Sequence, residues 1–136
     1  MDHSLDTTQF GVHYMLDGYN GAPSILSDKQ KIEELLATLP QRIGMHPITS
    51  PIVIEAGPNN KKDPGGISGF VMIAESHISI HTFPKRGFVS VDTYTCTNEL
   101  DTEQLTKEFT EFFALGDSEM HVIARGTKYP VENIYP

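Results

Sequence analysis

The sequence of 136 residues contains only one cysteine, which excludes an intrachain disulfide. A single cysteine in an acidic chain is typical of a protein in a reducing compartment, and we expect a cytoplasmic location. Long apolar runs are also missing, since no stretch approaches the roughly 18 consecutive apolar residues that a membrane-spanning helix needs. Residues 1–6 have neither a basic region nor an apolar run, so we expect neither secretion nor membrane insertion.

Basic side chains are scarce as well. The chain has 10 Lys and Arg residues against 18 Asp and Glu residues, and its formal net charge is −8. Binding to nucleic acid would need a local cluster of basic side chains to overcome the general repulsion. The densest basic sites are the two pairs Lys61-Lys62 and Lys85-Arg86, which fall in expected loops. We therefore expect no nucleic-acid partner.

The composition that is present suits a single folded unit. Hydrophobic residues make up 38% and charged residues 21% of the sequence, and there is no internal repeat. A chain of this length can bury a substantial core in one compact domain. We therefore treat residues 1–136 as one domain and look for one site.

Two segments have the periodicity of amphipathic helices. The first is expected to begin after an N-cap at Ser27 and to end at Pro40. Its apolar residues recur at i, i+3, i+4 and i+7: Ile32, Leu35, Leu36 and Leu39. The second is expected to be capped by Asp101 or Thr102. Its apolar stripe is Leu105, Phe109, Phe112 and Phe113.

Short apolar or alternating segments predict the strands. They are residues 10–19, 47–56, 68–74, 77–83, 88–96 and 120–125. Residues 57–66 form a polar loop long enough to suggest a function, and residues 84–87 form a hairpin turn. The resulting order, β-α-β-β-β-β-α-β, predicts an α+β fold: a two-layer sandwich with two helices on one face of a mainly antiparallel sheet.

Alternation along the central hairpin assigns its two faces. Ile78 and Ile80 share one face with Val89 and Val91, which suits packing against the helices. The opposite face carries polar and aromatic residues: His77, Ser79, His81, Phe83, Phe88, Ser90, Asp92, Tyr94 and Cys96. Such a face is not typical of an idle solvent surface. We expect another subunit to cover it, or a pocket to form on it, or both.

Two familiar chemistries fit these polar residues poorly. Four residues of extended strand separate the Cα atoms of His77 and His81 by about 13 Å, which is too far for one metal ion. A serine hydrolase is also disfavoured, because the G-x-S-x-G motif is absent. We therefore expect no metal cofactor.

The full arrangement of these groups has a more specific match. Residues 74–84 read Ala-Glu-Ser-His-Ile-Ser-Ile-His-Thr-Phe-Pro, with Ser68 eight residues before Ser76 and Cys96 twenty residues after it. This pattern resembles the proenzymes of the prokaryotic S-adenosylmethionine decarboxylases, which depend on a pyruvoyl group. The similarity extends over most of the chain, as far as the closing His-Val-Ile-Ala-Arg-Gly of residues 121–126.

The resemblance implies that the chain cuts itself between Glu75 and Ser76. In this family the serine hydroxyl attacks the preceding carbonyl and converts an amide into an ester, a step favoured by tethering the nucleophile next to its target. The residue matching His81 then removes the α-proton of Ser76, and the ester is eliminated to leave dehydroalanine, which hydrolyses to a pyruvoyl group. The residue matching Ser68 assists the first step.

The resemblance also implies a two-chain mature enzyme, with a β chain of residues 1–75 and an α chain of residues 76–136. The pyruvoyl group made from Ser76 would form a Schiff base with the amine of the substrate and accept the electrons left when carbon dioxide departs. Cys96 matches the family's proton donor. A thiol with an unperturbed pKa of about 8.5 can serve as an acid near neutral pH.

Some residues depart from the family pattern on the substrate side. Lys85 stands where the family has an acidic residue that accepts hydrogen bonds from the ribose hydroxyls, and a lysine offers no acceptor. Asp17 stands where the family often has glutamate. No aromatic residue corresponds to the one that stacks on adenine, and counting without gaps puts Lys62 near that position. Asp17 and Lys85 are therefore the candidate substrate-binding residues.

Three functions follow from this pattern. The leading hypothesis is an S-adenosylmethionine decarboxylase that serves spermidine synthesis in the polyamine pathway. The second keeps the pyruvoyl chemistry and changes the substrate to arginine or ornithine, because of Lys85 and the missing aromatic residue. The third is an unprocessed homologue without enzyme activity. The resemblance further implies a homodimer of cleaved αβ pairs, with sheets facing each other, or a higher oligomer.

Overall fold

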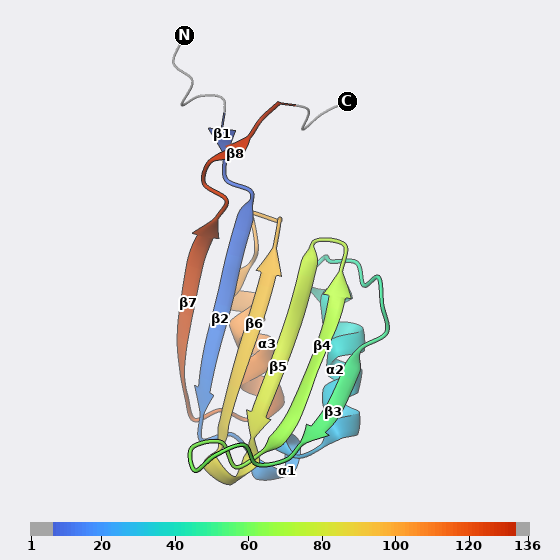
Figure 1. Ribbon diagram of the computed structural model, residues 1–136, viewed down its shortest axis with the longest axis vertical. Helices are drawn as coiled ribbons and strands as arrows, with labels where there is room; N and C mark the ends of the chain where they lie inside the picture. The colour runs from blue at the N-terminus through green and yellow to red at the C-terminus, as the bar shows by residue number, and fades with distance from the viewer. Residues whose placement is uncertain (1–6, 133–136) are drawn as a thin grey trace.

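The computed structural model describes residues 7–132 and is built on one large sheet (Figure 1). Six strands lie in the order β3-β4-β5-β6-β2-β7, and every neighbouring pair is antiparallel. The strands are β2 (Gly11–Tyr19), β3 (Ile52–Ala56), β4 (Gly66–Ile73), β5 (Ser76–Phe83), β6 (Phe88–Thr95) and β7 (Asp117–Arg125). A separate pair joins β1 (Thr7–Thr8) to β8 (Tyr129–Pro130), and the sequence pattern did not predict it.

The helices cover one face of the sheet, as predicted. Figure 1 shows α2 (Lys29–Arg42) and α3 (Thr102–Phe113) behind the sheet, with the short α1 (Pro23–Leu26) near one end. The α+β fold class is therefore confirmed, with one more helix than expected. The predicted apolar stripes supply much of the core, together with the inward-facing strand residues Tyr14, Leu16, Val71, Ile78, Ile80, Val89 and Val91. Burying each large apolar side chain contributes about 1.5–3 kcal/mol.

The first helix begins one residue later than predicted. Asp28, not Ser27, is the N-cap of α2, and its carboxylate accepts a hydrogen bond from the backbone N–H of Lys31. Ser27 instead closes α1, where its hydroxyl donates to the carbonyl of Pro23. Both residue types are good N-caps, so the local preference alone does not choose between them. Because α1 ends at Leu26 and Ser27 is its C-cap, Asp28 becomes the N-cap of α2.

Pro40 was expected to end α2, and this prediction is wrong. The helix continues to Arg42, with Pro40 buried inside its last turn. Proline removes one backbone hydrogen bond from a helix, a cost that tertiary contacts can offset. Here the backbone N–H of Met45 donates to the carbonyl of Pro40, which satisfies an acceptor at the helix end.

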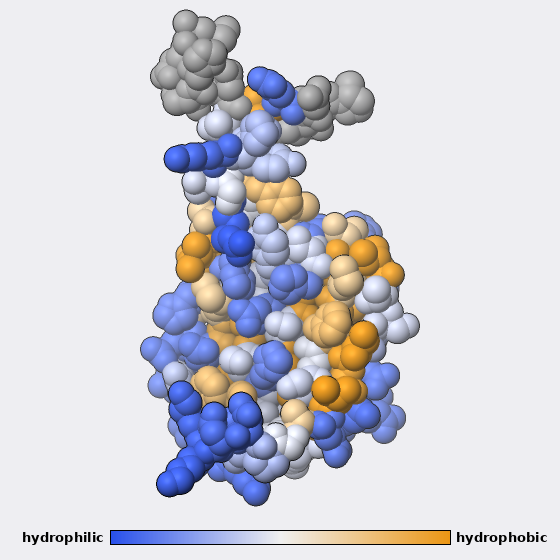
Figure 2. All heavy atoms as spheres, viewed as in Figure 1, coloured by the Kyte–Doolittle hydropathy of each residue, from blue (hydrophilic) through white to orange (hydrophobic). Residues whose placement is uncertain are grey.

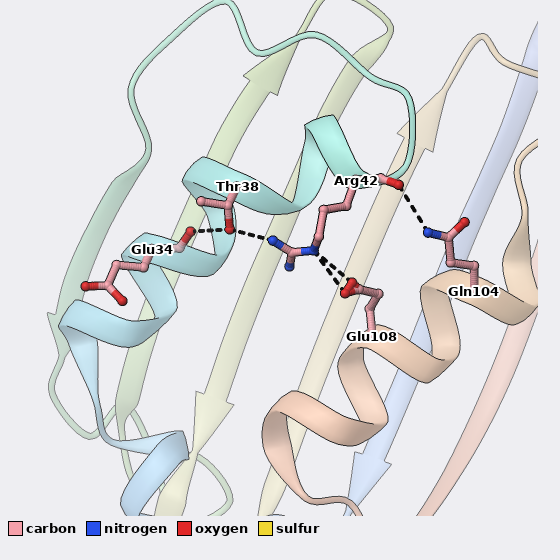
Figure 3. A network of polar contacts seen from close by, with 5 residues as sticks. All are labelled: Glu34, Thr38, Arg42, Gln104 and Glu108. Carbon is pink, nitrogen blue, oxygen red and sulfur yellow. Dashed lines mark hydrogen bonds and ion pairs between the residues drawn. The ribbon is translucent and has the colours of Figure 1, made fainter.

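A polar network ties this last turn to α3 (Figure 3). Arg42 Nε lies 3.0 Å from both carboxylate oxygens of Glu108, and Gln104 Nε2 donates to the carbonyl of Arg42 at 3.1 Å. On its own helix, Arg42 also donates to Thr38, whose hydroxyl donates to the carbonyl of Glu34. An exposed ion pair contributes about 1 kcal/mol or less. The network therefore orients the two helices more than it stabilises the fold.

The central hairpin has the predicted buried face. Ile80 pairs with Val91 and both are buried beneath the helices, as expected from alternation. The strand predicted at residues 47–56 is realised in two parts: β3 itself and an isolated bridge between Pro47 and Ile73. Between them Ile48 still donates its backbone N–H to the carbonyl of Met72, and residues 49–51 leave the ladder.

The opposite face of the sheet is open in this chain and is the face seen in Figure 2. Apolar side chains gather over β3 and β4, while the middle strands present polar groups. The exposed apolar side chains on these two strands are Ile52, Ile54, Phe70 and Met72. Within residues 7–132, no helix combines the length and the apolar character needed to cross a membrane.

Candidate active site

The predicted cleavage bond lies at the tight turn between β4 and β5. Ile73 pairs with Ser76 across the ladder, so only Ala74 and Glu75 form the turn. Two-residue hairpin turns usually place positive φ angles on the turn residues. In this turn the positive φ, 150°, falls on Ser76 instead. Side chains other than glycine rarely adopt such a backbone, which costs on the order of 1–3 kcal/mol, so strain is concentrated at this residue.

The carbonyl of Glu75 is held by the strand that follows β5. The backbone N–H of Cys96 donates to the Glu75 carbonyl oxygen at 3.0 Å, one step beyond the pairing of Ser76 with Thr95. The Cys96 thiol is free and exposed. On the other side, Gly11 of β2 lets the backbone of Thr95 and Cys96 come close, because a Cβ at that position would clash with the Thr95 carbonyl. The structure thus brings Glu75, Ser76 and Cys96 together.

The side chain of Glu75 is fixed as firmly as its carbonyl. Its two carboxylate oxygens accept hydrogen bonds from the backbone N–H of His46 at 3.0 Å and from His46 Nδ1 at 2.8 Å. Partial burial raises the pKa of the Glu75 carboxyl, but the bonds from His46 outweigh this effect and hold the pKa below its ordinary value. The group is therefore an anion at neutral pH.

Ser68 and His81 form a second polar pair on the open face. They lie opposite each other on β4 and β5, and Ser68 Oγ is 2.9 Å from His81 Nδ1. The pair borders a hollow of about 250 Å³, which also includes Phe70, His77 and Ser79. These residues are thirteen positions apart in the sequence, and the antiparallel ladder brings them into contact.

The Ser68–His81 pair and Ser76 are not brought together within one chain. His81 is five residues from Ser76 along β5, which corresponds to about 16 Å in an extended strand. Ser68 pairs with His81 and so lies equally far from the turn. A proton transfer needs heavy atoms about 3 Å apart, directly or through one water. The Ser68–His81 pair of a chain therefore does not reach the Ser76 of the same chain.

The row of paired residues that contains Ser68 and His81 extends across the sheet to β2, next to a larger cavity. Ser90 and Asp17 follow His81 in the same row of paired residues. Asp17 lies 3.9 Å from His121 Nε2 on the neighbouring β7. The next row on the same face leads into a cavity of about 520 Å³, lined by Tyr19, Lys62, Asp63, Phe83, Arg86 and Phe88.

Three of the six residues that line this cavity are aromatic. The Phe88 ring lies 5.5 Å from Tyr19 and 5.6 Å from Phe83, measured between ring centroids. The Tyr19 hydroxyl donates to Glu119, and this hydrogen bond raises the pKa of Tyr19 to about 12. Tyr19 therefore stays protonated at neutral pH, so its hydroxyl remains a hydrogen-bond donor committed to Glu119.

Comparison with known proteins identifies the family. Residues 12–126 match the S-adenosylmethionine decarboxylase family. The chain belongs to this family. It is 33% identical over 122 residues to the S-adenosylmethionine decarboxylase proenzyme of Pyrococcus horikoshii, covering 90% of this chain and 81% of that protein. It is 32% identical over 120 residues to the corresponding proenzyme of Moorella thermoacetica, covering 88% and 90%.

A solved structure agrees with the sequence relatives. The adenosylmethionine decarboxylase of Aquifex aeolicus VF5 superposes with a TM-score of 0.72 at 26% identity, covering 88% of this chain and 92% of that one. Membership of the S-adenosylmethionine decarboxylase family confirms the predicted enzyme class, a decarboxylase whose pyruvoyl cofactor derives from a serine. The individual site residues and the position of the cut stay predictions.

Lys85, a predicted substrate-binding residue, stays a prediction. It is exposed in the short 3₁₀ turn (Pro84–Arg86) and lines a separate hollow with Ser27 and Glu55, rather than the aromatic cavity. Lys62, which gapless counting put near the family's stacking position, does line that cavity. Among the described residues, no group of three or more His, Cys, Asp or Glu side chains could hold a metal ion.

Sequence reasoning missed His46. It lies 29 residues before Glu75, in a segment that the pattern placed just outside a strand. Nothing in its local sequence distinguishes it from an exposed loop histidine. The aromatic cavity was only partly foreseen: alternation put Phe83 and Phe88 on the open face, but it gave no sign that Asp63 from the 57–66 loop would join them.

Proposed function

We propose that this protein is a self-processing S-adenosylmethionine decarboxylase that cuts itself between Glu75 and Ser76. The cut would give a β chain of residues 1–75 and an α chain of residues 76–136 headed by a pyruvoyl group. The observation that carries this proposal is the hydrogen bond from the Cys96 N–H to the Glu75 carbonyl, beside the strained backbone of Ser76. The expected product is decarboxylated S-adenosylmethionine for spermidine synthesis.

The geometry suits the first step of cleavage. The Ser76 Oγ attacks the Glu75 carbonyl carbon, and the negative charge that develops on the oxygen is stabilised by the Cys96 N–H, as in an oxyanion hole. The C–N bond then breaks, the Ser76 nitrogen takes the proton lost by the hydroxyl, and an ester remains. Conversion to the ester also releases the backbone constraint at Ser76.

The second step needs a base, and the Ser68–His81 pair can provide one. When Nδ1 of His81 donates to Ser68 Oγ, the other ring nitrogen is left unprotonated and can accept the α-proton of Ser76. Loss of that proton breaks the Cβ–Oγ bond and releases the main-chain carboxylate of Glu75, which becomes the C-terminus of the β chain. Hydrolysis of the remaining dehydroalanine releases ammonia and completes the new N-terminus.

We place this base in the partner subunit of a homodimer. The separation of about 16 Å along β5 argues against cleavage by the His81 of the same chain. An opposed second copy would set the Ser68–His81 end of one open face against the Ser76 end of the other. The exposed apolar residues Ile52, Ile54 and Phe70 on that face suit such a cover.

The residues around Ser76 fit the cofactor that the family requires. After cleavage Ser76 would begin the α chain, close to Cys96, whose thiol is exposed. The pyruvoyl group, once formed, supplies a carbonyl that binds the substrate amine and takes up the electrons left by carbon dioxide. Cys96 then delivers a proton to the substrate carbon.

Replacing Cys96 with serine should separate cleavage from turnover. The backbone N–H of residue 96 is retained, so Cys96→Ser is expected to cleave to completion. A hydroxyl is a far weaker acid than a thiol, and loss of a general acid typically costs about 10²–10⁴-fold, so we expect kcat to fall by on the order of 10²-fold. Gel analysis and carbon dioxide release measure the two effects. Failure of the variant to cleave would contradict the assignment of the backbone N–H.

The aromatic cavity suits the adenosyl part of the substrate. Tyr19, Phe83 and Phe88 offer ring faces for adenine, and Asp63 at the rim offers a carboxylate that accepts hydrogen bonds from a ribose diol. Asp17, in the row next to the cavity, would attract the sulfonium charge. Since Lys85 lines another hollow, it would not oppose that charge.

We also place the enzyme in the cytoplasm, where Cys96 stays reduced.

Labelled substrates test the proposed function. The purified protein is expected to show two fragments in place of the intact 15.1 kDa chain, and to release labelled carbon dioxide from carboxyl-labelled S-adenosylmethionine but not from arginine or ornithine. The relatives that the chain matches are S-adenosylmethionine decarboxylases, so the two amino acids are not favoured. Complete cleavage without release from S-adenosylmethionine would refute the substrate. A single stable chain would refute the whole proposal.

A further inference from the structure

The segment of residues 46–48 runs beside the end of β4 and reaches the cleavage turn. The backbone N–H of Ile48 donates to the carbonyl of Met72 at 3.0 Å, and Pro47 forms a bridge with Ile73. The last contact is the N–H of Ala74, which donates to the carbonyl of His46 at 2.7 Å. This segment therefore fixes the backbone up to the residue just before Glu75.

The His46 side chain extends this support to Glu75 itself. Its ring is 77% exposed, while the Glu75 carboxylate that it holds is only 15% exposed. An imidazole so exposed contributes little packing to the core. Its one polar contact in the described structure is the ring hydrogen bond to Glu75, for which Nδ1 must carry the proton because a carboxylate only accepts.

Two segments of the chain thus hold Glu75 by hydrogen bonds. The main chain and ring of His46 hold its carboxylate, and the main chain of Cys96 holds its carbonyl. Together these bonds fix the rotation of the peptide group that Ser76 must attack. Attack on a carbonyl depends on a near-attack geometry, and a misplacement of about 1 Å can cost about 10²-fold in rate.

We infer that His46 is a positioning residue for self-cleavage, acting through the Glu75 carboxylate on the orientation of the scissile carbonyl. This inference rests on the proposed cut between Glu75 and Ser76. His46 does not touch the reacting atoms, and it is neither acid nor base in either step. Its task is to hold the turn while the amide is converted to the ester.

The test measures the half-time of cleavage of freshly synthesised chain by gel or intact mass. His46→Ala keeps the backbone bond to Glu75 and loses the ring bond, so cleavage is expected to slow about tenfold. His46→Asn is expected to restore most of the rate, because its amide nitrogen lies where Nδ1 lay. His46→Gln places its amide near the position of Nε2 and is expected to stay slow. This asymmetry would not arise from a merely structural role.

A double-mutant cycle isolates the pair. Glu75→Ala removes both bonds from His46 and is expected to slow cleavage at least as much as His46→Ala, and the double variant is expected to be no slower than Glu75→Ala alone. Additive losses would show that the two side chains act separately and would overturn the inference.

The matched control is Thr49→Ala, just after the same segment. Thr49 is exposed, and its hydroxyl accepts a bond from the N–H of Met72 without touching the turn. It should cleave at the wild-type rate, and an equal slowing in both variants would reduce His46 to general support of the segment. If wild type cleaves and His46→Ala keeps its rate, this inference alone falls. If wild type does not cleave, the proposed function falls first.

Discussion

Substituting Ser76 by alanine is expected to abolish both cleavage and decarboxylation. The variant has no hydroxyl to attack the Glu75 carbonyl, so the chain should persist as one species of 15.1 kDa. Without the new N-terminus there is no electron sink, and activity should fall by on the order of 10⁴-fold or more. Alanine suits the positive φ of residue 76 no better than serine does, so stability should change little. Intact mass and carbon dioxide release measure the two losses.

The matched control is Ser79→Ala on the same strand. Ser79 lies three residues beyond Ser76, about 10 Å along β5, and faces the open side of the sheet. It is expected to cleave to completion. Cleavage of Ser76→Ala at the original position, or an uncut Ser79→Ala, would show that another hydroxyl attacks the bond.

Of two inactive variants produced together, one is expected to rescue cleavage of the other. His81→Ala keeps the nucleophile and lacks the base, whereas Ser76→Ala keeps the base and lacks the nucleophile. In a mixed dimer the His81 of the Ser76→Ala chain can serve the Ser76 of the His81→Ala chain. Alone, each chain should remain uncut, since removing a positioned base costs about 10²–10⁴-fold. Together, only the His81→Ala chain should be cut.

Tags of different mass on the two chains show which chain is cut. They thus distinguish rescue between chains from slow cleavage of a variant by itself. The co-produced Ser76→Ala chain is an internal control, because it must stay intact in every case. A second control pairs His81→Ala with Ser68→Ala, where both chains keep Ser76 and neither supplies a complete pair. If His81→Ala stays uncut beside Ser76→Ala while mixed dimers are present, cleavage within one chain would be the better account.

Local patterns predicted most of the elements. The helical periodicity of Leu35 and Leu39 and the alternation of Ile78 and Ile80 each predict burial against one partner surface. All four side chains are buried in the core, so these predictions are confirmed. The ends of the elements were predicted less well. Pro40 lies inside a helix because Met45 and α3 support its last turn, and no local rule contains those contacts.

The chemistry-bearing residues divide in the same way. Ser76 and Glu75 are neighbours in the sequence, and their position at a tight turn follows from the two flanking strands. The pairing of Ser68 with His81 follows from an antiparallel register that the hairpin fixes. His46, in contrast, reaches Glu75 across 29 residues, and no periodicity reports such a contact.

By itself, then, the sequence determined the family and the type of cofactor and predicted which residues take part in cleavage, because these depend on residue types at fixed spacings. The tertiary structure decided how those residues are grouped. It set Cys96 and His46 against Glu75, and it kept His81 about 16 Å from Ser76, because a β-strand is extended and cannot fold back on itself within five residues.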